Sequence, residues 1–197
     1  MIAIIGYGGF AREIGCRLKP DTYRYFIPNE LYTTKKYDKN ILPMHKLDYK
    51  NSQVIVAIGN GLTRKRIINE IENYAKFYTF IDKHVKILDK TNVNIGEGSL
   101  ICAGSILTTN INIGKHSIIN INNTIGHDVN IGNFCTSSPS VNISGNCNIS
   151  DLVTIGTNSC IKEKIKIVDN VIIGMGSCII KDITESGTYI KYNQKLV

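Results

Sequence analysis

The side chains best suited to move a proton near neutral pH are the four histidines of the chain, His45, His84, His116 and His127. His127 is followed directly by Asp128, and Gly145 stands eighteen residues after His127. If one coil of a repeat holds eighteen residues, His127 and Gly145 stack on adjacent coils about 4.8 Å apart. A histidine above a bare glycine amide suits acyl transfer, because the imidazole takes a proton from the acceptor while the amide stabilises an oxyanion. The alternative is a surface histidine without a catalytic role.

A metal site is not expected. His116 and His127 do not supply three ligands at suitable spacing. The six cysteines show neither Cys-x-x-Cys pairing nor His/Cys ligand spacing. Cys160 and Cys178 are eighteen residues apart and should stack on neighbouring coils. We interpret the cysteines as reduced packing residues.

The element that must position His127 and Gly145 is a six-residue repeat from Ile95 to Ile179. An aliphatic residue returns at every sixth position, with a single lapse at Ser137. A helix has a period of 3.6 residues and a strand a period of two, so this spacing predicts a parallel β-helix built from hexapeptides. Glycine often follows the aliphatic residue, where we expect tight corners with positive φ. These glycines are Gly96, Gly114, Gly126, Gly132, Gly156 and Gly174.

The first 82 residues follow a different pattern. An apolar strand at 2–5 runs into Gly6-Tyr7-Gly8-Gly9-Phe10-Ala11, and a helical pattern covers about 11–18. Amides at such a helix start can hold a phosphate, and the alternative is a tight turn without a ligand. Further expected elements are strands at 23–27, 54–58 and 77–81 and a helix at about 64–74, capped by Thr63. This small βαβ sheet is too short for a complete dinucleotide fold, which favours a mononucleotide or nucleotide-sugar over NAD.

Several residues of this section are candidates for substrate binding. Asn29 and Glu30 follow the second strand, where a nucleotide-binding fold places a ribose or base contact. Arg64 opens the later helix and could contact a phosphate or lie on a solvated face. The full candidate set is Gly6, Gly8, Gly9, Phe10, Asn29, Glu30, Asn60 and Arg64.

Charge and hydropathy limit the partners. The net charge of +7 and the pI near 9.1 favour anionic partners. No arginine-rich run or interleaved aromatic pattern predicts nucleic-acid binding. No signal peptide or membrane-spanning segment is apparent, so we expect a cytoplasmic protein. The predicted domains are a nucleotide-sugar-binding α/β domain at 1–82, a β-helix at 83–185 and a C-terminal tail at 186–197.

The glycine turn, the small βαβ domain and the hexapeptide repeat together resemble the sialic-acid O-acetyltransferase and bacillosamine N-acetyltransferase family. Members are trimeric, left-handed parallel β-helix acyltransferases that act on bacterial surface sugars with acetyl-CoA. The resemblance covers almost the whole chain and is strongest over 125–134, 138–139, 144–145 and 173–183. It implies a Rossmann-like N-terminal domain before a left-handed β-helix.

The resemblance also implies roles for individual residues. His127 corresponds to the general base, beside Asp128, and the Gly145 amide contacts the thioester carbonyl. Gly8 and Gly9 correspond to the nucleotide diphosphate site. Backbone groups lining the pantetheine arm correspond to Gly156, Thr157, Gly174 and Met175.

The chain departs from the family pattern at four places, of which one is Pro28-Asn29-Glu30, where the family usually has a carboxylate pair after the second strand. Gly126 stands where the family commonly has glutamate. Either Asp128 or a side chain of a neighbouring subunit orients His127, or the base is less well tuned. Cys135-Thr136 stand near the usual second histidine, and 191–195 replace the family's terminal motif that clamps the coenzyme's adenine end.

The resemblance therefore implies an acetyl-CoA-dependent N-acetyltransferase acting on a nucleotide-linked amino-deoxy sugar, without an acyl-enzyme and with active sites between subunits. The sugar, the nucleotide and the choice between an amine and a hydroxyl stay open. The alternatives are a sugar O-acetyltransferase of the sialic-acid type and a non-catalytic trimeric nucleotide-sugar-binding scaffold.

Overall fold

The structure is a computed structural model that describes residues 1–32 and 39–191 and the backbone of 194–195. Contacts group the chain into two compact units. The first comprises Met1–Gly59 and Thr63–Tyr78, and the second comprises Asn60–Leu62 and Thr79–Val197. Over the described residues, no helix is long and apolar enough to cross a membrane.

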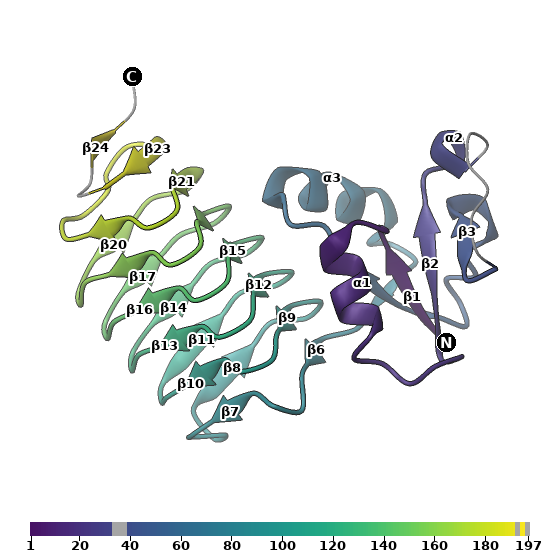
Figure 1. Cartoon of the computed structure of the whole chain (residues 1–197), viewed down its shortest axis with the longest axis horizontal. Coiled ribbons are helices and arrows are strands. Elements are labelled where there is room, and N and C mark those ends of the chain that lie inside the picture. Colours follow the sequence, from purple (N-terminus) through teal and green to yellow (C-terminus); the bar gives the residue numbers. More distant parts are fainter. Residues whose placement is uncertain (33–38, 192–193, 196–197) are drawn as a thin grey trace. The chain divides into compact units, whose positions relative to one another are not determined.

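The first unit is a parallel five-stranded sheet with strand order β3-β2-β1-β4-β5 (Figure 1). Its strands are β1 (Ile2–Ile5), β2 (Tyr23–Ile27), β3 (Ile41–Pro43), β4 (Gln53–Val56) and β5 (Lys76–Phe77). Its helices are α1 (Gly9–Gly15), α2 (Asn29–Tyr32), α3 (Gly61–Ile71) and the 3-10 turn Met44–Lys46. The chain order reverses direction between β1 and β4, and in open α/β sheets ligands bind at the carboxyl ends of strands beside such a switch point.

Some expected elements of this unit differ in extent. The helix expected at about 11–18 is shorter, because α1 begins at Gly9 and ends at Gly15. The strand expected at 77–81 is two strands: β5 completes the first sheet, whereas β6 (Phe80–Ile81) pairs with the solenoid strand β9. The solenoid thus begins a few residues before the boundary expected after residue 82. Sequence analysis missed α2 and β3, which are too short to show a period.

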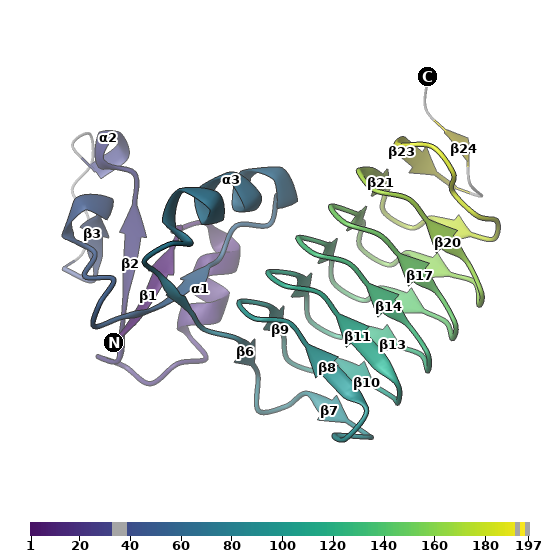
Figure 2. The same cartoon turned by 180° about the vertical axis from the view of Figure 1, so that it is seen from behind.

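The second unit is a left-handed parallel β-helix, which confirms the predicted fold class (Figures 1 and 2). Its coils have three faces. Face 1 contains β6 (Phe80–Ile81), β9 (Leu100–Ile101), β12 (Ile118–Ile119), β15 (Thr136–Ser137), β18 (Thr154–Ile155), β21 (Val171–Ile173), β23 (Gly187–Ile190) and β24 (Gln194–Lys195). Face 2 contains β7 (Lys86–Ile87), β10 (Ile106–Leu107), β13 (Thr124–Ile125), β16 (Asn142–Ile143), β19 (Cys160–Ile161) and β22 (Cys178–Ile179). Face 3 contains β8 (Val93–Ile95), β11 (Ile111–Ile113), β14 (Asn130–Ile131), β17 (Asn148–Ile149) and β20 (Lys166–Ile167).

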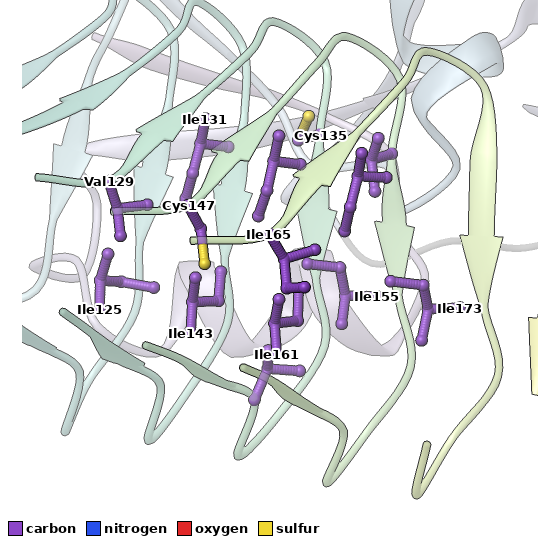
Figure 3. Packing of buried hydrophobic residues seen from close by; sticks show 14 of the residues in the cluster. Ile125, Val129, Ile131, Cys135, Ile143, Cys147, Ile155, Ile161, Ile165 and Ile173 are labelled. Carbon is purple, nitrogen blue, oxygen red and sulfur yellow. The ribbon is translucent and has the colours of Figure 1, made fainter. Parts of the chain in front are cut away.

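The core is made by columns of residues eighteen apart. Ile125 pairs with Ile143, and Ile143 with Ile161, so identical side chains stack along the axis (Figure 3). Smaller inward residues four positions after each isoleucine, such as Val129 and Cys147, fill the space beside the isoleucines. The tail continues face 1, because β23 pairs with β21 in parallel and β24 pairs with β23 in antiparallel fashion. The sequence departs from the family's terminal motif at 191–195, and residues 192–193 of that stretch lie outside the described residues.

The lapse at Ser137 has a partner in the core. Asn123 is fully buried, and its Oδ1 accepts a hydrogen bond from the Ser137 hydroxyl. The Asn123 amide donates to the carbonyls of Asn120, at 2.8 Å, and Ser138, at 3.0 Å. An isoleucine at 137 would leave Asn123 Oδ1 without this donor, so the polar residue in the aliphatic series satisfies a buried polar group.

The role expected for the corner glycines is wrong. Positive φ falls two residues after the glycine, as at Asp128 (φ 60) and Asn158 (φ 58), and not at Gly126 or Gly156. At Gly156 an added Cβ would lie 2.5 Å from the backbone nitrogen of Met175, in the next coil. Glycine is therefore required at this position by the close approach of successive coils, and not by its backbone conformation.

Candidate functional site

Corner 2–3 is the set of loops that join face 2 to face 3, and it includes residues 108–110, 126–129, 144–147 and 162–165. His127 lies on this corner after β13, and its side chain is 58% exposed. Gly145 lies under the imidazole, since a Cβ added there would be 2.7 Å from both Cε1 and Nε2 of His127. The eighteen-residue spacing thus brings His127 and Gly145 together on adjacent coils.

The backbone N–H groups at the hexapeptide position of Gly145 differ between the corners of the solenoid. At the same hexapeptide position on the corner between faces 3 and 1, Lys115 N–H donates to Asn133 Oδ1 at 2.8 Å, and Asn133 N–H to Asp151 Oδ1 at 2.7 Å. Within the described part of the chain, no acceptor is paired with the Gly145 N–H. A buried backbone N–H is rarely left unpaired in a folded protein. This amide is therefore a candidate to bind an acceptor oxygen beside His127 Nε2.

Asp128 orients the imidazole. Its Oδ2 lies 2.6 Å from His127 Nδ1, and its Oδ1 accepts a hydrogen bond from Asn110 Nδ2 at 2.5 Å. The hydrogen bond from Asn110, followed by the contact with His127, holds the pKa of the Asp128 carboxyl below its usual value. An ionised carboxylate only accepts hydrogen bonds, so it places the proton of a neutral His127 on Nδ1 and leaves Nε2 as the basic nitrogen.

The same geometry leaves no room for a side chain directly before His127. A Cβ at Gly126 would lie 2.7 Å from the backbone nitrogen of Gly145, so no side chain fits there without moving a coil. The contact with His127 is made by Asp128, the residue after the histidine, and not by the residue before it. Asn110 was missed by sequence analysis, although its eighteen-residue spacing from Asp128 was a usable signal.

The residues expected along the pantetheine arm lie on another corner. Gly156, Thr157, Gly174 and Met175 stack on corner 1–2, which joins face 1 to face 2. Met175 is 77% exposed, and the exposed Ile121 belongs to the same column further up the solenoid. Face 2 separates this corner from His127, so a single chain does not bring the expected base and the expected coenzyme residues together.

A second candidate region lies within the first unit. A cavity of about 270 Å³ opens at the carboxyl ends of the strands, lined by Gly6, Asn29, Glu30 and Glu70 among apolar side chains. Asn29 Oδ1 accepts a hydrogen bond from the backbone N–H of His45 at 3.2 Å, which ties this wall to the turn after β3.

The remaining candidates from the first 82 residues do not line this cavity. Gly8 and Gly9 are exposed, and a Cβ added to either would have open space around it; Phe10 is half-buried in α1, and Asn60 is exposed.

Arg64 lies in an environment different from both that were expected for it. Only 1% of this residue is exposed, so it lies neither on a solvated face nor where it could meet a substrate phosphate. Its Nη1 donates to the carbonyl of Ile58, at 2.6 Å, and of Gly59, at 3.0 Å. Arg64 therefore satisfies the backbone after β4.

Two further features concern cysteines and metals. Cys160 and Cys178 pair in register on face 2 with their Sγ atoms 3.2 Å apart. Among the residues that the structure describes, no three His, Cys, Asp or Glu side chains come together as a metal-binding group.

Comparisons with protein-family models and with curated proteins found no match to the sequence. Comparison with solved structures found similar proteins along nearly the whole chain. WeeI from Acinetobacter baumannii AYE is 28% identical with a TM-score of 0.87, and the match covers 96% of each chain. PerB from Caulobacter crescentus, solved with CoA and GDP-perosamine, is 20% identical with a TM-score of 0.84 over 96% of this chain and 93% of PerB.

A third similar structure is the acetyltransferase domain of PglB from Neisseria gonorrhoeae FA1090 in complex with acetyl coenzyme A. It is 21% identical with a TM-score of 0.71, over 99% of this chain and 98% of that domain. At about 20% identity, PerB and PglB show a shared fold. With WeeI, these neighbours confirm the resemblance to hexapeptide-repeat sugar acetyltransferases that the sequence indicated.

Proposed function

We propose that this chain, which shares its fold and its repeat with the hexapeptide-repeat sugar acetyltransferases, transfers acetyl from acetyl-CoA to the amino group of a nucleotide-linked amino-deoxy sugar. The acceptor would be of the UDP- or dTDP-4-amino-4,6-dideoxyhexose type, used to build a bacterial surface glycan. The observation that carries the proposal is the imidazole of His127 lying over the unpaired amide of Gly145. The nucleotide-sugar and coenzyme ligands of PerB, a protein of the same fold, support the reaction class.

The proposed reaction is direct transfer. The amine of the sugar attacks the thioester carbonyl carbon, the new C–N bond forms, and the carbonyl oxygen becomes an oxyanion that accepts a hydrogen bond from Gly145 N–H. His127 Nε2 takes the proton that the attacking nitrogen loses. The intermediate then collapses, the C–S bond breaks, and CoA leaves with the proton. No cysteine acts as a nucleophile, so the kinetics are not ping-pong.

The proposed enzyme is a trimer. His127 and Gly145 occupy corner 2–3, whereas Gly156 and Met175 occupy corner 1–2 of the same chain. A site that uses both sets needs a second copy whose corner 1–2 faces this corner 2–3. Three copies around one axis repeat this contact and close the ring, which gives three equivalent sites.

The proposed nucleotide site is the cavity at the carboxyl edge of the first sheet. Its volume of about 270 Å³ and its apolar walls suit a planar base, and Glu30 offers oxygen acceptors to base or ribose donors. The net charge of +7 favours a phosphorylated ligand. A reaction that draws on acetyl-CoA would place the chain in the cytoplasm.

The test is release of the CoA thiol with a panel of UDP-, dTDP- and GDP-linked 3-amino and 4-amino dideoxy sugars, with sialic acid beside them. We expect release with a nucleotide-linked amine, and a fall in turnover of about 10² to 10⁴ in His127→Ala. Release with sialic acid alone would replace the amine by a hydroxyl acceptor. Absence of any rise in Tm with saturating acetyl-CoA would overturn the enzyme proposal and favour the non-catalytic scaffold.

A further inference from the structure

Three side chains on corner 2–3 form a continuous line. Asn110 Nδ2 donates to Asp128 Oδ1 at 2.5 Å, and Asp128 Oδ2 lies 2.6 Å from His127 Nδ1. Asn110 lies eighteen residues before Asp128, on the same corner of the preceding coil. We infer that Asn110 is a positioning residue for acetyl transfer, which acts through Asp128 to fix the ring and the neutral tautomer of His127. The inference rests on the proposed function, since it concerns the proposed base.

The carboxylate of Asp128 needs such a support. Its side chain is 42% exposed, so water competes for both oxygens and rotation about its side-chain bonds is not blocked by packing. The amide of Asn110 occupies one oxygen and thereby directs the other toward His127. The same hydrogen bond lowers the pKa of the Asp128 carboxyl below its ordinary value, which further favours the ionised form that accepts a hydrogen bond from His127 Nδ1.

The backbone at both positions is built for these residue types. Asn110 has φ 54 and Asp128 has φ 60, in the left-handed region that asparagine, aspartate and glycine tolerate. Glycine can therefore replace either residue without backbone strain, and the loss of the side chain can be measured by itself.

Hydrogen bonds between asparagines of successive coils also occur on face 3, without a contact to His127. On face 3, Asn94 donates to Asn112 at 2.9 Å and Asn112 to Asn130 at 3.0 Å. In those pairs both side chains are uncharged asparagines. The partner of Asn110 is instead the charged residue that contacts the base, and a test must therefore separate a role in catalysis from a role in coil stacking.

The test compares four glycine variants: Asn110→Gly, Asp128→Gly, the double variant, and Asn170→Gly as the control. Asn170 is also exposed with a positive φ of 58, but it lies on the corner between faces 3 and 1. Steady-state kinetics would give kcat and the KM for acetyl-CoA. Nitrogen-15 NMR of His127, recorded without substrate, would report which ring nitrogen carries the proton.

We expect Asn110→Gly to lower kcat about 10-fold, by analogy with the loss of hydrogen-bond partners that orient metal-bound histidines, with the KM for acetyl-CoA unchanged. The double variant should be no slower than Asp128→Gly, since Asn110 acts through Asp128. The NMR signal should move from Nδ1-protonated imidazole toward a mixture of tautomers, and Asn170→Gly should match the wild type.

Wild-type kcat together with an unchanged tautomer in Asn110→Gly would overturn the inference, as would a further loss in the double variant. If the wild type acetylates no acceptor, the proposed function fails. The tautomer measurement then still decides this inference, because it needs no reaction.

Discussion

The contact between His127 and Gly145 can be tested by adding a single carbon atom. In Gly145→Ala the new Cβ would lie 2.7 Å from Cε1 and Nε2 of the imidazole, whereas ordinary contacts begin at 3.4 Å. The ring must therefore withdraw by about 0.7 Å, which moves Nε2 from its place above the amide and strains its contact with Asp128. A misplacement of about 1 Å costs roughly 10²-fold in rate, so we expect kcat to fall about 10- to 100-fold.

The assay is CoA thiol release under saturating acetyl-CoA, with the Tm recorded for each variant. Ser144→Ala is the matched control, because this exposed residue precedes Gly145 in the same loop and should keep wild-type kcat. The Tm of Gly145→Ala should stay close to that of the wild type, since an exposed imidazole can move without opening the core. Wild-type kcat in Gly145→Ala would refute the reasoning, because the base could then work from a displaced position.

Two further predictions concern buried polar groups and cysteines. Ser137→Ala should lower the free energy of unfolding by about 1–3 kcal/mol, because Asn123 Oδ1 loses its donor in the core; urea unfolding measures this, and an unchanged midpoint would contradict it. Peroxide should oxidise Cys160 and Cys178 to a disulfide, in which two thiols give up two protons and two electrons and peroxide becomes water. Closing a loop of 18 residues should stabilise the chain by about 3 kcal/mol, measured as a higher Tm that Cys178→Ser abolishes; oxidation without intramolecular pairing would count against it.

The repeat could be predicted from the sequence because each coil contributes the same inward position. Isoleucines six apart cannot share one face of a helix or one side of a strand, so their period alone indicates the solenoid. The lapse at Ser137 could not be interpreted in the same way. Its reason is Asn123, which lies fourteen residues earlier and off the column, and only the coil geometry brings the two side chains together.

The candidate site was predicted in part. His127 and Gly145 are related by the repeat, so their spacing was sufficient to stack them. Arg64 was misjudged because a charged residue in a helix is usually solvated, whereas here its guanidinium is buried against two carbonyls. The corner glycines were assigned a positive φ that belongs to other positions, because the sequence does not reveal how closely successive coils approach.

The stacking of one coil on the next also fixes distances along the axis of the solenoid. Most paired residues are eighteen apart, but Lys86 pairs with Ile106 at a spacing of twenty and Val171 with Gly187 at a spacing of sixteen. The loops between strands can therefore change length without disturbing the columns, while each coil still advances the axis by about 4.8 Å. The axial offset between the coil of His127 and the coils of Gly156 and Gly174 is therefore quantised. Substitutions can change individual side chains along this chain, but the axial offset between His127 and the loops of corner 1–2 can change only by whole coils.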